Sequence, residues 1–97
     1  MRRDARTDAN HAEIREGLCR AGYAVFDVHH VPGLLDLQVL SKNGLIIVPM
    51  EIKSFEGKLT PKEEKYLKSW PGHIVRTLDE ALEIMYKIDR IMIKYEC

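Results

Sequence analysis

Cysteine is scarce in this sequence, which contains only Cys19 and Cys97 among 97 residues. With no C-x-x-C pair and no Cys/His ligand spacing, the sequence excludes a disulfide framework and a zinc-finger type of fold. No apolar run approaches the roughly 20 residues that span a bilayer, and the charged N-terminus lacks the apolar segment of a signal peptide. These absences predict a soluble protein of a reducing cytoplasm, with no membrane partner.

An excess of charge of either sign is also missing, because fifteen Lys and Arg balance fifteen Asp and Glu. This neutrality counts against a protein that coats nucleic acid with a basic surface, and against an acidic disordered tail. The apolar share of 45% is that of a globular protein, and the length suits one domain. We therefore expect a flexible basic arm over residues 1–7 and a single domain over residues 8–97.

Turn and cap signals divide the chain into seven elements. Asn43-Gly44 is a strong hairpin signal, and Thr60-x-x-Glu63 and Thr77-x-x-Glu80 are capping boxes that open helices. Apolar periodicity predicts a helix over 8–21, strands over 23–30, 34–40 and 45–53, a helix over 60–70, a strand over 73–76, and a helix from 77 almost to the C-terminus.

This order, α-β-β-β-α-β-α, indicates an α/β fold with a mixed four-stranded sheet covered by helices on both faces. The hairpin makes the second and third strands antiparallel. The two strands that flank the middle helix should be parallel, joined by a right-handed crossover.

Charged residues interrupt two of the otherwise apolar strands. Asp36 lies in the second strand, and Glu51 and Lys53 share one face of the third. A Glu-x-Lys pair alone is most often a solvated rim. If Glu13 of the first helix converges with Asp36 and Glu51 within about 5 Å, each carboxylate pair repels by about 3 kcal/mol at an effective dielectric of 20. Either these acids stay apart, or an oxygen-preferring cation such as Mg²⁺ or Mn²⁺ lies among them.

The arrangement Gly33-Leu34-Leu35-Asp36, followed after fourteen intervening residues by Glu51-Ile52-Lys53, resembles the PD-(D/E)XK nuclease signature. More narrowly, residues 8–14 and 57–64 resemble the small VRR-NUC members of that superfamily, many of them from phages. The resemblance extends over roughly residues 8–84. It implies a restriction-endonuclease-like α/β/α sandwich and a metal-dependent endonuclease that cuts DNA.

Position by position, the resemblance makes Asp36 and Glu51 the metal-binding carboxylates, with the carbonyl of Ile52 as a further ligand of Mg²⁺ or Mn²⁺. It makes Lys53 the group that orients the attacking water and steadies charge on the phosphate. Glu13 matches the acid of the first helix, which holds the metal directly or through water. Glu64 stands where many relatives carry glutamine, and it receives only a supporting role.

Two positions depart from the family pattern. Leu35 replaces the signature proline, which is a backbone device and not a ligand. Pro49 lies within the third strand, where it removes a ladder hydrogen bond. We expect a bulge just before Glu51 to accommodate the proline. Such a bulge could change the direction of the Glu51 carboxylate, or it could mark a site that has lost the family's catalytic geometry.

Local positive charge reconciles a neutral chain with DNA as a partner. The candidate DNA contacts are Lys58, Lys62 and Lys65 around the middle helix, and Arg2 and Arg3 in the basic arm. A plain solvated helix face explains the lysines equally well. Relatives that stand alone are thought to cut branched DNA such as Holliday junctions, and symmetric cutting needs two sites. The apolar last helix (Ile84, Ile88, Ile91, Met92, Ile93, Tyr95) is therefore a candidate homodimer surface.

Two alternatives remain open at this stage. A non-catalytic module could keep the nuclease fold and bind nucleic acid or a protein, and Pro49 is the best support for it. A small assembly protein could be held together by its last helix alone. The charges of Asp36, Glu51 and Lys53 on interior strands argue against both, because no requirement of the fold places them there.

Overall fold

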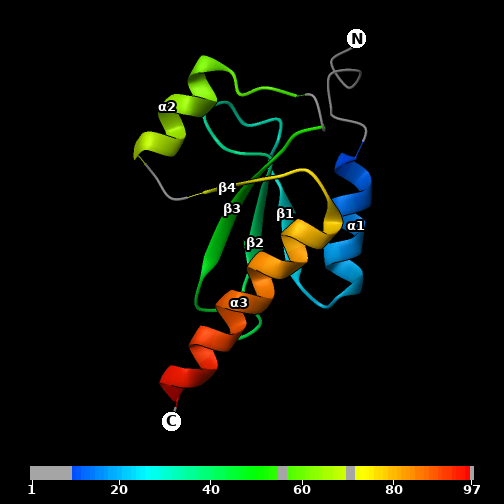
Figure 1. Cartoon of the computed structure of the whole chain (residues 1–97), viewed down its shortest axis with the longest axis vertical. Coiled ribbons are helices and arrows are strands. Elements are labelled where there is room, and N and C mark those ends of the chain that lie inside the picture. Colours follow the sequence, from blue (N-terminus) through cyan, green and yellow to red (C-terminus); the bar gives the residue numbers. More distant parts are fainter. Residues whose placement is uncertain (1–9, 55–56, 70–71, 97) are drawn as a thin grey trace.

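Seven elements follow one another in a computed structural model of the chain, which describes residues 10–54, 57–69 and 72–96 (Figure 1). Their order is α1 (His11–Arg20), β1 (Ala24–Asp27), β2 (Leu37–Leu40), β3 (Ile47–Ile52), α2 (Pro61–Ser69), β4 (His73–Val75) and α3 (Leu78–Glu96). The predicted α-β-β-β-α-β-α order is confirmed. No helix in the described part of the chain is long and apolar enough to cross a membrane.

The four strands form one mixed sheet in the order β1-β2-β3-β4. β2 pairs antiparallel with both β1 and β3, whereas β3 pairs parallel with β4. The hairpin between β2 and β3 closes as predicted, with Gly44 at φ 78° and the amide of Leu45 bonded to Oδ1 of Asn43 at 3.0 Å. Both expected strand pairings are therefore confirmed.

The strands are shorter than the apolar pattern suggested. β2 begins at Leu37 instead of residue 34, because the preceding segment forms successive turns. In these turns the amide of Val31 bonds to the carbonyl of Val28 at 2.9 Å, and that of Leu34 to Val31 at 3.3 Å. Asp36 thus lies at the last position before β2 and not inside it.

Pro49 is accommodated without the expected bulge. The pairing of β2 with β3 runs without interruption from Leu40 opposite Ile47 to Leu37 opposite Met50. The amide of Ser41 bonds to the carbonyl of Ile46, so hydrogen-bonded pairs alternate from there and Pro49 falls at a non-bonded position. Its missing N–H faces the side of β4, which begins only opposite Met50. Pro49 therefore removes no hydrogen bond between β3 and its neighbouring strands.

One face of the sheet carries the hydrophobic core. α1 and α3 lie together on this face, as Figure 1 shows. The fully buried side chains include Ile14 and Leu18 of α1, Leu37 and Met50 of the sheet, and Met85 of α3. Gly17 permits the close approach of the two helices, because an added Cβ would lie 2.4 Å from Leu78.

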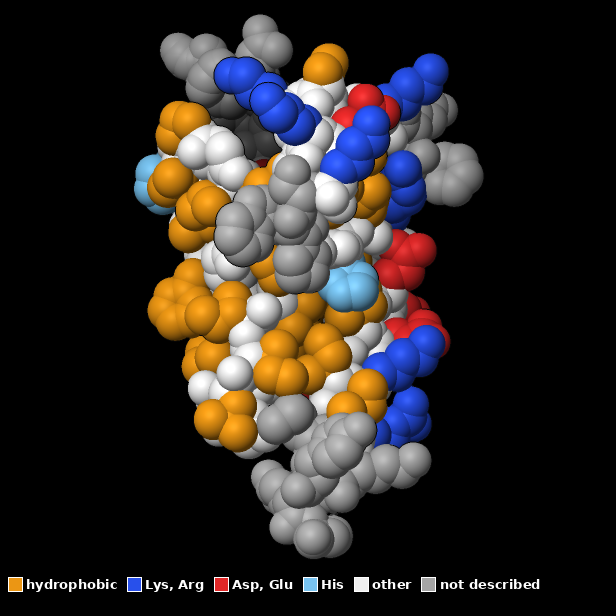
Figure 2. All heavy atoms as spheres, turned by 90° about the vertical axis from the view of Figure 1, so that its left-hand side faces the viewer, with side chains coloured by type: hydrophobic (Ala, Val, Ile, Leu, Met, Phe, Trp, Pro, Cys, Tyr) orange, Lys and Arg blue, Asp and Glu red, His pale blue; other side chains and the backbone are white. Residues whose placement is uncertain are grey.

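The opposite face is covered at one end only, so the expectation of a sheet covered on both faces was partly wrong. α2 lies over that end: an added Cβ on Gly72 would lie 2.7 Å from Leu35 and 3.1 Å from Leu67 of α2. Beyond α2, Phe26 and Ile47 remain 52% and 57% exposed. Figure 2 shows hydrophobic side chains spread over much of the side of the molecule that it presents.

Replacing Leu37 with alanine should destabilise the protein by about 2–4 kcal/mol, because it leaves a cavity between the sheet and α1. Urea unfolding followed by circular dichroism measures this loss. Leu45→Ala is the matched control: this leucine is 73% exposed, and its removal should change stability by less than about 0.5 kcal/mol. Equal effects at the two leucines would contradict the assignment of the core to the α1–α3 face.

Candidate active site

The pairing of β2 with β3 brings Asp36 and Glu51 together. Leu37 lies opposite Met50, so one step further along the strands Asp36 lies opposite Glu51. Oδ2 of Asp36 accepts a hydrogen bond from the amide of Ile52 at 3.0 Å, which fixes this carboxylate against β3. Both acids belong to the sheet face over which α2 lies.

Lys53 connects these acids to α2. Its Nζ lies 3.6 Å from Oε2 of Glu51 and 2.9 Å from Oε1 of Glu63, and its side chain is only 13% exposed. The carbonyl of Lys53 accepts a hydrogen bond from the side chain of Asn10, which also bonds to the carbonyl of Arg76. The end of β3 is therefore held from the α1 side and the α2 side at once.

Glu63 also belongs to the site, although the sequence indicated only a helix-capping role for it. The capping box forms as predicted: the amide of Thr60 bonds to Oε1 of Glu63, and the amide of Glu63 to Oγ1 of Thr60. A capping-box glutamate points back toward the start of its helix. Here the start of the helix faces Lys53, so Oε1 of Glu63, the oxygen that caps the helix, also forms an ion pair with Nζ of Lys53. Glu64, the neighbour with an expected supporting role, is exposed.

A pocket of about 200 Å³ opens beside these residues. Its lining includes the carboxylates of Asp36, Glu51 and Glu63, with Lys62 and Tyr66 of α2 on one side and His29 on the other. Thr60 and the segment from Val31 to Leu35 complete the lining. The pocket therefore joins a buried acidic floor to a mouth that carries a lysine, a tyrosine and a histidine.

Burial shifts the titration of the acids on this floor. It raises the pKa of Glu51, and a hydrogen bond with Glu63 and the charge of Asp36 raise it further against the opposing charge of Lys53. Burial likewise raises the pKa of Asp36, although the Ile52 amide opposes the shift. Burial also acts to raise the pKa of Glu63, but hydrogen bonds from Glu51, Thr60 and Lys53 outweigh it and lower that pKa. The site holds more acid than its one lysine neutralises.

Of the remaining predicted residues that the structure describes, only Lys62 lines the pocket. Glu13 is exposed on α1, and among the described residues it has no hydrogen bond or ion pair with Asp36, Glu51 or Lys53. Lys58, Lys62 and Lys65 are all exposed. Figure 2 shows Lys and Arg side chains gathered toward the end of the molecule where α2 lies in Figure 1. Arg2 and Arg3 lie outside the described residues.

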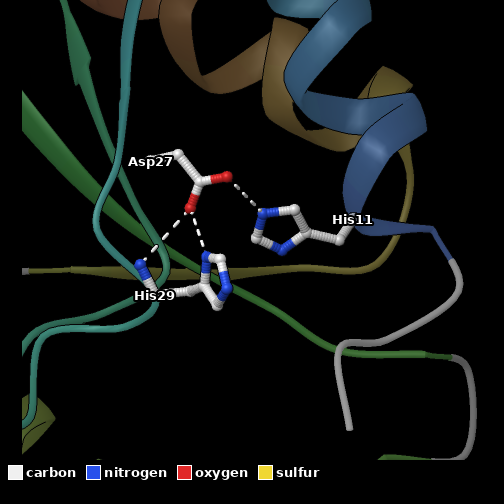
Figure 3. A group of neighbouring side chains, drawn as sticks. All are labelled: His11, Asp27 and His29. Carbon is white, nitrogen blue, oxygen red and sulfur yellow. Dashed lines mark hydrogen bonds and ion pairs between the residues drawn. The ribbon is translucent and has the colours of Figure 1, made fainter. Parts of the chain in front are cut away.

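A second cluster lies next to the pocket and was not recognised from the sequence. His11 and His29 both contact Asp27, as Figure 3 shows: Nε2 of His11 lies 3.2 Å from Oδ2, and Nδ1 of His29 lies 2.6 Å from Oδ1. Although burial acts to raise the pKa of Asp27, hydrogen bonds from His29 and His11 lower it to about 2. The only sequence signal was the Asp27-x-His29 spacing, because His11 joins from a separate helix.

A scan against protein-family models and searches of curated proteins and of solved structures returned no match to this chain. The geometry of the site is therefore the basis for any functional conclusion. That geometry consists of Asp36 opposite Glu51, a lysine that joins Glu51 to a third acid, Glu63, and a pocket that the three acids line.

In metal-free buffer, Glu51→Gln should be more stable than the original protein at about pH 8, and this advantage should shrink toward pH 5. The pKa of Glu51 is raised in the folded state, so its contribution to stability is full below its ordinary pKa and is lost as pH rises toward the folded value. Glutamine has nearly the same shape and does not ionise. Urea unfolding in EDTA should show a difference that grows with pH to about 1 kcal/mol or more.

The matched control for this experiment is Glu83→Gln. Glu83 is exposed on α3, where it pairs with Lys87 at 3.4 Å. Its replacement should leave the pH dependence of stability unchanged. A stability difference for Glu51→Gln that stays constant from pH 5 to pH 8 would show that Glu51 is not held in a disfavoured charged state.

Proposed function

We propose that this protein is a metal-dependent nuclease of the PD-(D/E)XK type, similar to the small VRR-NUC members, that hydrolyses phosphodiester bonds in DNA. The observation that supports this proposal most directly is the cross-strand position of Asp36 and Glu51 on the floor of a pocket, with Lys53 beside Glu51. The mixed sheet with helices against both faces is compatible with a restriction-endonuclease-like fold.

The side chains of the site suit Mg²⁺ or Mn²⁺. Asp36, Glu51 and Glu63 offer only carboxylate oxygens, which hard divalent cations prefer. When ionised, these three acids exceed the charge of Lys53 by two, and a divalent cation would cancel that excess. In this proposal Asp36, Glu51 and the carbonyl of Ile52 hold the metal. Glu63 replaces Glu13 as the third acid near the centre, because Glu13 is exposed on α1.

In this proposal the bound cation, Lys53 and Lys62 have different roles in the hydrolysis of the phosphodiester. A cation bound at this site would supply a more acidic water and offset charge that grows on the phosphate. The ammonium of Lys53, held between Glu51 and Glu63, donates hydrogen bonds that place the attacking water and steady a phosphate oxygen. Lys62 at the mouth of the pocket binds the adjacent phosphate of the strand.

The substrate that we propose is branched DNA, such as a four-way junction, in the cytoplasm of a bacterium or a phage-infected host. Lys58, Lys62 and Lys65 supply positive charge beside the pocket, and Arg2 and Arg3 would extend it along the DNA backbone. The balanced charge of the whole chain favours weak binding of ordinary duplex, so selection by the shape of the junction suits this protein.

Cleavage of a labelled four-way junction should require Mg²⁺ or Mn²⁺ and should fall about 100-fold or more in Asp36→Asn, Glu51→Gln and Lys53→Met. Glu83→Gln and Lys87→Met replace a similar ion pair on the exposed side of α3 and should cut normally. Duplex and single-stranded DNA tested in parallel measure the preference for branches.

The outcomes separate nuclease from binding module. Cleavage that persists in Asp36→Asn and Lys53→Met would refute the site. Junction binding without cleavage in either metal, measured by gel shift, would establish the non-catalytic module in place of the enzyme. Absence of both binding and cleavage at low salt would favour an assembly protein.

We also propose that the active form is a homodimer, because symmetric cutting of a junction requires two copies of the site. Ile84 and Ile88 of α3 pack against the core of their own domain, so they are not the spare apolar surface that the sequence suggested. Tyr86 and Ile91 on α3 are 48% and 52% exposed and are the better candidates. The side chains of Met92, Ile93 and Tyr95 lie outside the described residues.

Size-exclusion chromatography with light scattering should give a mass of two chains at micromolar protein concentration. Ile91→Glu should shift the protein toward one chain, because a charge in an apolar contact has no partner. Arg20→Glu, which adds negative charge to the exposed side of α1, away from this surface of α3, should leave the mass unchanged. A single-chain mass for the original protein at these concentrations would end the dimer hypothesis.

A further inference from the structure

His11, Asp27 and His29 form a cluster that the proposed nuclease chemistry does not use. They come from three places: the first turn of α1, the last residue of β1, and the turn that follows β1. Within the part of the chain that the structure describes, this is the group of three His, Cys, Asp or Glu residues whose potential ligand atoms all lie within 4.8 Å of one another.

The fold positions each of the three donors separately. Asp27 is the last residue of β1 and lies opposite Leu37, so its side chain points to the sheet face that α1 covers. His11 is buried at the start of α1 and reaches Asp27 from that side. The amide of His29 also bonds to Oδ1 of Asp27 at 3.3 Å, which folds the turn back and brings the ring to the same carboxylate.

We propose that His11, Asp27 and His29 bind a divalent transition metal such as Zn²⁺, at a site that adjoins the Asp36–Glu51 pocket through His29 but uses its own three donors. Two imidazoles and one carboxylate are a donor set that transition metals accept and that Mg²⁺ does not favour. This inference does not depend on nuclease activity.

The distances suit such an ion. Ligand atoms at about 2.0–2.2 Å from a tetrahedral Zn²⁺ lie roughly 3.3 Å apart. Nε2 of His11 and Oδ2 of Asp27 are already 3.2 Å apart. Nδ1 of His29 lies 2.6 Å from the other carboxylate oxygen, Oδ1, and one ligand atom from each of the three residues lies within 4.8 Å of the other two. A small movement of the exposed His29 ring would therefore complete the set.

The surroundings leave one side of the cluster open. His11 is 5% exposed, whereas the side chain of His29 is 38% exposed and also lines the pocket of Asp36 and Glu51. Three protein donors leave a fourth position for water or a ligand. Arg15 lies 3.2 Å from Oδ2 of Asp27, where it orients the carboxylate from outside but also repels a cation. We therefore expect binding in the micromolar range and not the very tight binding of a structural zinc site.

The test is a titration of the tag-free full chain with ZnCl₂ by calorimetry at about pH 7.5, after removal of metal with EDTA, because histidine binds metal as the neutral imidazole. We expect one Zn²⁺ per chain. His29→Gln should weaken binding by about tenfold or more, and Asp27→Asn should do the same. His29 is exposed, so its replacement should leave the fold intact even if His11→Gln unfolds the protein.

The controls separate this site from others that could take the ion. His73→Gln removes an exposed histidine of β4, and Cys19→Ser removes an exposed thiol; both should bind Zn²⁺ as the original does. Asp36→Asn should also leave the Zn²⁺ affinity unchanged to within about threefold, while it removes cleavage if the nuclease proposal holds. Titration of Co²⁺ provides a visible spectrum that reports coordination directly.

Several results would overturn the inference. These are the absence of saturable binding near one ion per chain, binding that is unaffected in His29→Gln and Asp27→Asn, or binding that is lost in Asp36→Asn or Cys19→Ser. The two proposals fail independently. If the protein does not cut DNA, the Zn²⁺ inference still stands, and if it does not bind Zn²⁺, the nuclease proposal still stands.

Discussion

The antiparallel pairing of β2 with its two neighbours positions Asp27, Asp36 and Glu51, the acids that the sheet contributes to the two candidate sites. Leu37 lies opposite Met50 on one side and opposite Asp27 on the other. The first pairing places Asp36 across from Glu51, and the second fixes where Asp27 meets α1. A slip by one residue would turn Leu37 and Met50 out of the core and bury charges in their place, so the core itself enforces the register.

The two faces of the sheet have different chemical roles because they have different cover. The face under α1 and α3 is filled by aliphatic side chains and supplies the stability of the domain. The face under α2 is covered at one end only, and there it holds Glu51 at 4% exposure with Asp36 and Lys53 nearby. Burial of acids beyond what one lysine neutralises costs stability. Acids with raised pKa values in a pocket are candidates for binding or catalysis.

The order of the elements and much of the proposed site were open to prediction because their signals are local. The Asn43-Gly44 turn joined β2 to β3, and the two capping boxes opened α2 and α3 where expected. The alternation of side chains along β3 put Glu51 and Lys53 on one face. The role of Glu63, the partial cover of the second sheet face and the regular strand pairing at Pro49 were not predicted, because each depends on how separate segments pack together.

The sequence by itself determined the seven elements, the antiparallel hairpin and the placement of Glu51 and Lys53 on one face of β3, since turn, cap and period-two patterns act over a few residues. Tertiary structure alone decided that Glu63 and not Glu13 meets Lys53, and that His11 joins Asp27 and His29. Those contacts join residues from separate elements, and their distances follow from how helices pack on the sheet. No local pattern contains that information.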